Sequence, residues 1–179
     1  MAKARPSQPA TLIAGILSAF PEMFDVCEEI LAKEYGPVSL SSDVFDFTYT
    51  DYYNEEMGEG IKRKFLAFER LIQPDEIAAI KIRTNEIERD IAAKGDSRLS
   101  VPRPVNLDPG YIDAGKLVLA TVKDQAHRIY LGGGIYAEVT LYWKHGAWET
   151  WPWTYADYRS SAYQRFFAEV REHHLRKRQ

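Results

Sequence analysis

A run of three glycines, at positions 132–134, separates two segments in which apolar and polar residues alternate. The first segment covers residues 127–131, and the second covers residues 135–143. Alternation with a period of two is typical of a β-strand with one buried face, and glycine accepts the positive φ angles of tight hairpin turns. The pattern therefore predicts a β-hairpin. Because an isolated hairpin is only marginally stable, we expect it to be part of a larger antiparallel sheet.

A turn formed by the three glycines also predicts the register and the two faces of the hairpin. The expected pairs are Leu131 with Ile135, Tyr130 with Tyr136, and Arg128 with Glu138. The expected core face holds Ile129, Leu131, Ile135, Ala137, Val139 and Leu141. The other face holds Arg128, Tyr130, Tyr136, Glu138, Thr140 and Tyr142. On that face, an exposed ion pair between Arg128 and Glu138 would be worth about 0–1 kcal/mol.

Upstream of the hairpin, strand and helix signals follow one another in the order β-α-β-β-α-β. The clearest helix covers residues 22–35, where apolar residues including Cys27 recur at helical spacing before Gly36. This order is that of the ferredoxin-like split unit, in which two helices cover one face of an antiparallel sheet. The expected strands cover residues 11–19, 44–48, 61–71 and 103–107, and the second helix begins at Pro74 and stops at Gly95.

The rest of the chain is expected to extend this unit. Residues 113–122 favour a helix with Asp113 as its cap and Leu117 on its inner side. After the hairpin, the expected elements are a strand at 147–151 and a helix at 160–174 that packs through Tyr163, Phe166, Phe167 and Val170. The predicted fold class is therefore α+β: an antiparallel sheet with helices on one face, built from a ferredoxin-like unit extended by a C-terminal hairpin and helix. We expect one domain, residues 1–179.

The composition excludes several classes of protein. Hydrophobic residues make up 45% and charged residues 27% of the 179 residues, which is the balance of a folded globular chain. Cys27 is the only cysteine, so an internal disulfide and a cysteine-based zinc cluster are excluded. The apolar run at residues 11–20 is too short to span a bilayer, and we expect a cytoplasmic protein without a membrane partner. A net charge of −3 does not favour nucleic acid as a partner.

Residues 110–117, Gly-Tyr-Ile-Asp-Ala-Gly-Lys-Leu, nearly match a phosphate-binding loop. In that motif, G-x-x-x-x-G-K-[ST], the last residue carries a side-chain hydroxyl that binds Mg²⁺, and Leu117 has no hydroxyl. We interpret the match as chance and predict no GTP hydrolysis by such a loop. A weaker interpretation keeps Lys116 as an anion contact at the start of the expected helix, where backbone N–H groups are free. The alternative is that Lys116, Lys123 and the basic run 62–64 are surface cations.

The segment at residues 106–111, Asn-Leu-Asp-Pro-Gly-Tyr, has the composition of a turn. Polar side chains at a strand end often meet a ligand, so Asn106 and Asp108 are candidates despite the structural role of a turn. A pocket would form if this segment covered the polar face of the hairpin and enclosed Arg128 and Glu138. The ligand-binding candidates are Asn106, Asp108, Tyr111, Lys116, Lys123, His127, Arg128 and Glu138. No sequence motif assigns a catalytic residue or a metal ligand.

All four tryptophans fall within residues 143–153. They are interpreted as a small core between the last hairpin and the last helix, because aromatic side chains bury large areas. An aromatic ligand platform or a protein-binding surface is the functional alternative.

Three motifs carry a resemblance to a known family: residues 106–111, residues 116–124 (Lys-Leu-Val-Leu-Ala-Thr-Val-Lys-Asp) and residues 127–131 (His-Arg-Ile-Tyr-Leu). With them, nearly the whole chain resembles a bacterial family of uncharacterised proteins. Some members of that family are labelled GTP-binding, although the family brings no established activity. The resemblance implies a relative, and no particular reaction.

Two functions follow as hypotheses. The first is binding of, and action on, a small phosphorylated or anionic ligand such as a nucleotide, with Mg²⁺ as a cofactor that accompanies the phosphate. The second is a non-catalytic protein-interaction module that uses the Trp-rich C-terminal region. RNA binding ranks third, because the strands lack the aromatic consensus that such sheets use to stack bases.

Overall fold

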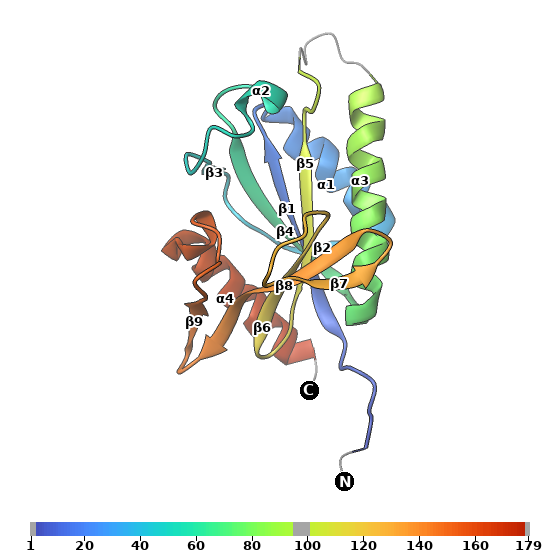
Figure 1. Cartoon of the computed structure of the whole chain (residues 1–179), viewed down its shortest axis with the longest axis vertical. Helices are drawn as coiled ribbons and strands as arrows, with labels where there is room; N and C mark the ends of the chain where they lie inside the picture. Colours follow the sequence, from blue (N-terminus) through green and yellow to red (C-terminus); the bar gives the residue numbers. More distant parts are fainter. Residues whose placement is uncertain (1–2, 95–100, 178–179) are drawn as a thin grey trace.

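The computed structural model describes residues 3–94 and 101–177, and the strands in this part of the chain form one antiparallel sheet (Figure 1). The strands are β1 (Ala10–Ser18), β2 (Val38–Ser41), β3 (Phe45–Asp46), β4 (Lys62–Ile72), β5 (Asn106–Ile112), β6 (Lys116–Thr121), β7 (Ile129–Gly132), β8 (Ile135–Lys144) and β9 (Ala147–Thr150). The helices are α1 (Glu22–Tyr35), α2 (Asn54–Met57), α3 (Ile77–Ala93) and α4 (Ser161–Lys177), with short 3-10 helices η1 (Pro74–Glu76) and η2 (Asp157–Arg159). The fold class is α+β, as predicted. The expected helix stop at Gly95 lies outside the described residues.

The first half of the chain is a ferredoxin-like unit. Its elements follow the order β1, α1, β2, β4, α3, β5, apart from the short β3 and α2 inserted before β4. In the sheet these strands lie in the order β2-β4-β1-β5, so the two central strands are the first and third of the unit. All of their pairings are antiparallel. The second half extends the sheet beyond β5 in the order β6-β8-β7.

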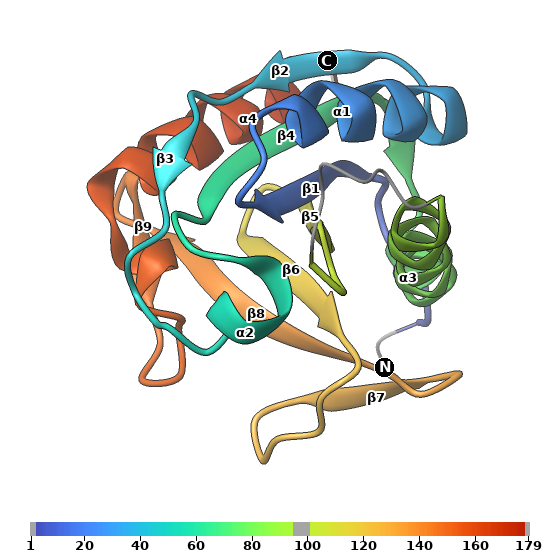
Figure 2. The same ribbon diagram turned by 90° about the horizontal axis from the view of Figure 1, so that it is seen from above.

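Two layers of helices cover the two faces of this sheet. Alternate residues of β1 point to opposite sides, and all nine are buried. Leu12 and Ile16 belong to a core shared with α1 and α3, whereas Ile13 belongs to a second core shared with α4. Seen from above, α3 and α4 lie on opposite sides of the central strands (Figure 2). The prediction of helices on one face is therefore correct for α1 and α3 and wrong for α4. A helix at the end of the chain covers whichever face remains open.

The expected second strand at residues 44–48 is wrong in position. The strand that pairs with the middle of β4 is β2, and β3 adds only two residues to the end of β4. Gly36 has a φ of +95° and ends α1, and the backbone N–H of Glu69 then bonds the carbonyl of Pro37. The chain thus joins the sheet immediately after the helix, in a segment too short for its alternation to be recognised.

Residues 106–122 contain the largest corrections. The expected turn at residues 106–111 is strand β5, and the expected helix at residues 113–122 is strand β6. Asp113 does accept hydrogen bonds from the N–H groups of Gly115 and Lys116, as a helix cap would, but here they close a tight turn between two strands. Both faces of β6 are buried, so its apolar residues are consecutive in sequence. The apolar–polar alternation that is typical of a strand is therefore absent.

The hairpin is confirmed, and its register is partly as predicted. Tyr130 pairs with Tyr136, but Gly132 pairs with Ile135 because Leu131 is the extra residue of a β-bulge. The expected burial of Ile129 and Leu131 is wrong, since these residues are 71% and 41% exposed at the edge of the sheet.

The faces of β8 also differ from the prediction. A second bulge at Thr140 interrupts the alternation, and Leu141 joins the core of α4. Glu138 and Thr140, expected on a solvent-facing side, are buried. The polar face of this strand therefore lies inside the molecule, where it needs partners.

Candidate functional site

The sheet splits between β5 and β6. These strands pair only through Gly110–Ile112 and Leu117–Leu119, and beyond that point β6 continues along β8 while β5 continues along β1. The backbone of Leu107, left without a strand partner on this side, is bonded by α3. Lys81 Nζ donates to the Leu107 carbonyl at 2.7 Å, and the Leu107 N–H donates to Glu88 Oε1 at 2.8 Å. Side chains of α3 thus make the hydrogen bonds that a neighbouring strand would make, and a gap remains in the sheet beside β5.

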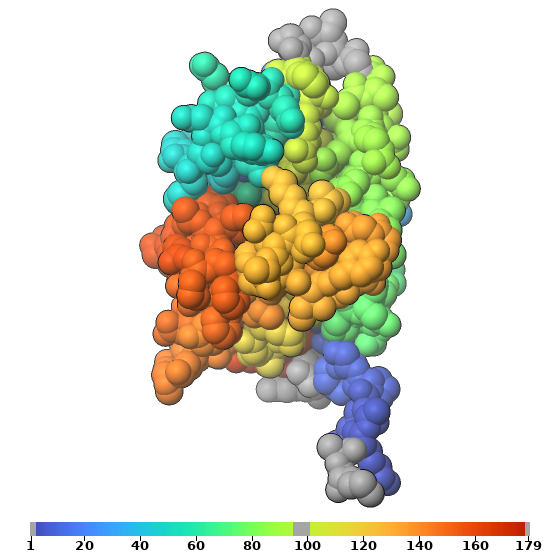
Figure 3. Space-filling view, viewed as in Figure 1, coloured from blue at the N-terminus to red at the C-terminus, as the bar shows by residue number. Residues whose placement is uncertain are grey.

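A pocket of about 510 Å³ occupies this gap. Three distant segments of the chain, near residues 50, 125 and 155, meet on the face seen in Figure 3, and all three contribute to its wall. Aromatic, cationic, amide and carboxylate side chains are mixed in the lining. The aromatic side chains are Phe47, Tyr49, Tyr52, Tyr53, Tyr155 and Tyr158; the polar ones are Arg63, Lys81, Arg103, Lys123, Asn85, Asn106, Asp108, Glu138 and Asp157.

Arg63 is the central charge of this pocket. It projects from β4 and is only 4% exposed. Its Nη1 donates to Asp108 Oδ2 at 2.9 Å, and its Nη2 donates to Asp157 Oδ2 at 3.3 Å. Its guanidinium also lies 5.5 Å from the ring centroids of Phe47 and Phe65. A buried guanidinium with two carboxylates and two rings is held rigidly, and its Nε has no partner.

The two carboxylates differ in their proton affinity. Burial raises the pKa of Asp157, and Arg63 only partly offsets this effect. Burial also acts to raise the pKa of Asp108, but the charges of Arg63 and Lys81 outweigh it and lower that pKa below its usual value. Asp108 is also the more exposed of the two, at 30% of its side chain against 6% for Asp157. At neutral pH Asp108 is therefore an ionised acceptor that reaches the pocket.

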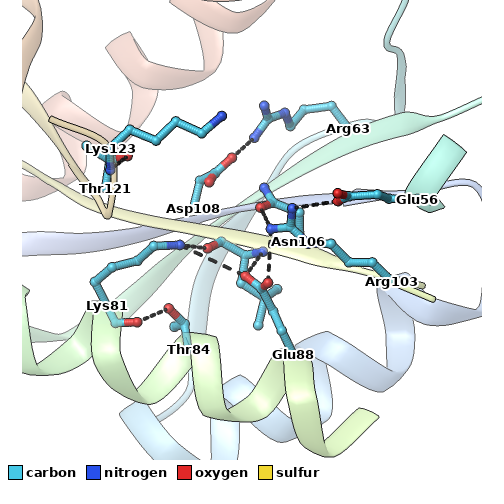
Figure 4. A network of polar contacts seen from close by, with 11 residues as sticks. Glu56, Arg63, Lys81, Thr84, Glu88, Arg103, Asn106, Asp108, Thr121 and Lys123 are labelled. Carbon is cyan, nitrogen blue, oxygen red and sulfur yellow. Dashed lines mark hydrogen bonds and ion pairs between the residues drawn. The ribbon is translucent and has the colours of Figure 1, made fainter. Parts of the chain in front are cut away.

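A second polar network lies beside this cluster and joins β5 to α2 and α3 (Figure 4). Arg103 forms ion pairs with Glu88 at 3.1 Å and with Glu56 at 3.6 Å, and it donates to the side-chain oxygen of Asn106. Asn106 is 5% exposed and is oriented by this contact. The network ties α2, α3 and β5 together at the edge of the pocket.

Glu138 is the buried carboxylate of the β8 wall. Its Oε2 accepts hydrogen bonds from Arg128 Nε at 2.8 Å and from His127 Nε2 at 3.1 Å, and its Oε1 accepts from Thr140. Arg128 also donates to the hydroxyl of Tyr155. Burial, together with the charge of Glu138, raises the pKa of Tyr155 to about 12, so this phenol stays protonated at neutral pH.

Lys123 differs from the other cations of the pocket. Its ammonium lies 4.8 Å from the ring centroid of Tyr52, a residue that is 68% exposed. Among the described residues, no carboxylate lies within ion-pair distance of Lys123. An exposed ammonium beside an exposed ring marks the mouth of the pocket and leaves one cation available for an anion.

A family model for a domain of unknown function, DUF4416, matches residues 8–174. The chain belongs to the DUF4416 family. This confirms the expected membership of an uncharacterised family, and the match names no activity. No curated protein and no solved structure matches the chain.

Within this DUF4416 domain, four of the predicted candidates line the pocket: Asn106, Asp108, Lys123 and Glu138. His127 and Arg128 lie behind Glu138 and hold it by hydrogen bonds. The other two lie elsewhere. Lys116 forms an ion pair with Asp113 at 2.6 Å in the β5–β6 turn, and Tyr111 is buried in the core of α1 and α3. Because Lys116 begins a strand, the proposed helix N-terminus for an anion is wrong.

Other pocket residues of the DUF4416 domain were missed or misread from sequence. Arg63, in the basic run taken as surface cations, is buried, and Lys81 and Asp157 come from α3 and η2. A basic residue between the apolar positions of β4 was the available signal for Arg63. Lys81, on the buried stripe of α3, gave a similar signal. A charged residue on a buried face needs a partner of opposite charge or a hydrogen-bond acceptor. Neighbouring residues in the sequence do not indicate which residue that partner is.

Two features are absent from the described residues. No group of three or more His, Cys, Asp or Glu side chains is placed to hold a metal ion. In residues 3–94 and 101–177, no helix is long and apolar enough to cross a membrane.

Proposed function

We propose that the pocket between β5 and β6 binds a small ligand that combines a flat unsaturated ring with an anionic group, such as a nucleotide. The observation that carries this proposal is the buried Arg63 cluster at the base of an aromatic-lined pocket. Its volume of about 510 Å³ lies within the range of roughly 300–1,000 Å³ that is usual for small-molecule sites. Charged groups that are costly to bury form ion pairs here, and the paired groups Arg63, Asp108 and Asp157 all line the cavity.

Two residues of the pocket wall each carry a buried polar atom without a partner in the described part of the chain. Arg63 Nε and the hydroxyl of Tyr158 are buried and make no hydrogen bond within the described residues. Both residues line the pocket, and both are less than 5% exposed. A buried polar atom without a partner is unfavourable by about 1–3 kcal/mol. Neither atom has accessible surface, so a ligand in the pocket would bond to them only after the wall rearranges.

The composition of the wall favours a ring over a simple anion. Six aromatic side chains supply stacking or edge contacts for a planar group. Asn85 supplies an amide, a group that recognises ring edges by its paired donor and acceptor. The amide of Asn106 is already bonded by Arg103 and Asp108. Phosphate would meet Lys123 at the mouth, and Mg²⁺ would enter with the phosphates of the ligand. The near match to a phosphate-binding loop has no part in this site, since residues 110–112 lie within β5 and Leu117 is fully buried.

A thermal-shift screen of the purified chain tests this proposal. The compounds are the common nucleosides, their 5′-mono- and triphosphates with and without Mg²⁺, and inorganic phosphate. A ligand at about 100 times its dissociation constant stabilises the native state by roughly 2.7 kcal/mol. We expect at least one nucleoside or nucleotide to raise the melting temperature, while inorganic phosphate alone does not.

A matched pair of variants locates the binding. Asn85→Trp places a large side chain in the pocket wall, and Arg89→Trp places one on the exposed side of the same helix. We expect the shift to be lost in Asn85→Trp and retained in Arg89→Trp. No shift with any compound, or equal shifts in both variants, would contradict the proposal.

The protein-interaction alternative has weaker support. Trp148 is buried in the core of α4, whereas Trp153 and Tyr155 are 37% and 42% exposed. The exposed Trp153 already stacks on Trp151 and on His127, with ring centroids 5.1 and 5.2 Å apart. These rings are thus largely occupied by one another. A negative ligand screen would return this alternative to first place.

A further inference from the structure

In the described part of the chain, the carboxylates of the pocket are more buried than its cation without a carboxylate partner, Lys123. The carboxylates of Glu138 and Asp157 are 1% and 6% exposed, and that of Asp108 is 30% exposed. Lys123 and its neighbour Tyr52 are exposed residues at the opening. Acceptors therefore lie inside, and the cation without a carboxylate partner lies outside.

The inner cations are already neutralised. Arg63 is shared by Asp108 and Asp157, so this cluster carries one more negative than positive group when both acids are ionised. Lys81 is bound to the Leu107 carbonyl, and Arg103 is paired with Glu88 and Glu56 in the second network of the site. A phosphate placed deep in the pocket would meet carboxylates before any available cation.

From this arrangement, and resting on the proposed function, we infer that the ligand enters ring first. The inner edge of the ring donates N–H or O–H groups to Asp108, and the phosphate stays with Lys123 at the mouth. The site then selects rings that carry a donor at that edge, together with one phosphate. Further phosphates extend into solvent, and the group nearest the carboxylates is the ring and not a phosphoryl bond.

Asp108 is the group best placed to select such a donor. Its Oδ2 accepts a hydrogen bond from Arg63, and Asn106 also donates to the carboxylate. The side chain still keeps 30% of its surface exposed in the pocket lining. An ionised carboxylate accepts hydrogen bonds and donates none, so an acceptor at the same ring edge would be repelled. Hydrogen bonds with one charged partner are roughly twice as strong as neutral ones.

The outer half of the inference is tested by isothermal titration of wild type, Lys123→Ala and the control Lys33→Ala. Lys33 is an exposed lysine of α1 that does not line the pocket. The probes are adenosine, guanosine, cytidine and uridine with their 5′-mono- and triphosphates. We expect wild type and Lys33→Ala to bind a monophosphate roughly 5- to 30-fold more tightly than its nucleoside, as one ammonium–phosphate contact provides. In Lys123→Ala this ratio should fall to near one, with nucleoside affinity unchanged. The triphosphate should bind within about threefold of the monophosphate, because its added groups lie in solvent.

The inner half is tested on the wild-type chain, so that no variant needs to fold. Guanosine is compared with 1-methylguanosine, and uridine with 3-methyluridine, since N-methylation removes the ring N–H donor. We expect methylation to weaken binding at least tenfold for the nucleoside that the site accepts. In Asp108→Asn, if its circular dichroism remains native, this discrimination should shrink.

The outcomes separate the two proposals. Binding of none of the probes to wild type would overturn the proposed function and the orientation with it. Binding in which Lys123→Ala keeps the monophosphate preference, or in which methylation has no effect, would overturn the orientation alone. The same holds for a triphosphate that binds far more tightly than the monophosphate.

Discussion

At the scale of single residues, the pocket depends on a glycine that the ligand-binding candidates do not include. Gly15 lies in the middle of β1, between Phe65 and Asp108 on the neighbouring strands. A Cβ atom at this position would lie 2.7 Å from Nη1 of Arg63 and 3.1 Å from the Phe65 ring. The guanidinium of Arg63 therefore occupies space that a side chain at position 15 would fill.

Gly15→Ala should displace Arg63 and destabilise the fold by about 1–3 kcal/mol, as overpacking of a core does. The control is Gly115→Ala, whose Cβ would meet only Asp113 Oδ1, at 3.8 Å. That change should stay within about 0.5 kcal/mol of wild type. Urea unfolding monitored by circular dichroism measures both variants. Equal stabilities for the two would show that Arg63 can move without loss.

Cys27 illustrates burial that the sequence pattern already predicted. It is 0% exposed on the inner side of α1, and burial, with a contribution from Glu88, raises the pKa of its thiol from 9.0 to about 12. Since the thiolate is the reactive form, the native thiol should be inert at neutral pH.

We expect a chromogenic disulfide reagent to label the native chain at pH 8 far more slowly than the urea-unfolded chain. The same shift has a consequence for stability. Because the folded pKa lies above the unfolded value, the contribution of Cys27 is complete below pH 9 and is lost as pH rises from about 9 to 12. Cys27→Ala should weaken that alkaline loss. Fast labelling of the native chain would contradict the burial.

At the scale of elements, the central feature is a sheet that opens between two sequential strands. Leu107 directs its N–H and carbonyl toward the gap, where Glu88 and Lys81 of α3 bond them. Because backbone groups alternate in direction along β5, the nitrogen of Pro109 points to the same side as that of Leu107. Proline has no N–H, so no acceptor on a neighbouring strand is needed there. The split is thus stabilised by backbone chemistry on β5 and by side chains of the neighbouring helix.

Lys81→Met keeps the length of the side chain and removes the donor to Leu107. We expect a loss of about 1–3 kcal/mol, since a buried carbonyl is left unsatisfied. Arg83→Met on the same helix removes an exposed cation paired with Glu34 and Glu86, and its effect should be smaller. Urea midpoints measure the difference, and faster hydrogen exchange at the Leu107 amide would locate it. A Lys81→Met variant as stable as Arg83→Met would show that water replaces the lysine.

At the scale of the whole molecule, one sheet separates two cores that share its central strands. Cys27 belongs to the core of α1 and α3, and Trp148 belongs to the core of α4. Alternate residues of β1 enter both cores, so neither can be lost while the other keeps its strand in place. The single domain expected from the sequence stays a prediction, and cooperative unfolding is its test.

We therefore expect one cooperative unfolding transition. Tryptophan fluorescence reports the core of α4, and the reactivity of the Cys27 thiol reports the opposite core. Their urea midpoints should coincide with each other and with circular dichroism. Two separated midpoints would show that α4 and its strands unfold as an independent unit.

The sequence alone determined the elements whose signals, such as periodicity and turn residues, lie within their own segment. The helix over residues 22–35 was predicted with its observed bounds, because an amphipathic stripe and a glycine stop both lie within the segment. The pairing of Tyr130 with Tyr136 was predicted for the same reason, since a short loop determines the register of its two strands. Asn106, Asp108 and Glu138 were named as candidates from their polarity, and they line the pocket. The strand that carries the first two was read as a strand end followed by a turn.

Tertiary structure alone decided which faces are covered and which charges meet. Ile129 has the pattern of a core residue and is exposed, because the sheet ends at β7. Arg63 and Asp157 lie 94 positions apart in the chain, and nothing in either neighbourhood names the other as its partner. Periodicity depends on residues a few positions apart, whereas burial and ion pairing depend on what the rest of the chain brings alongside. The pocket belongs to this second kind of information, because it forms where two strands adjacent in sequence do not remain paired.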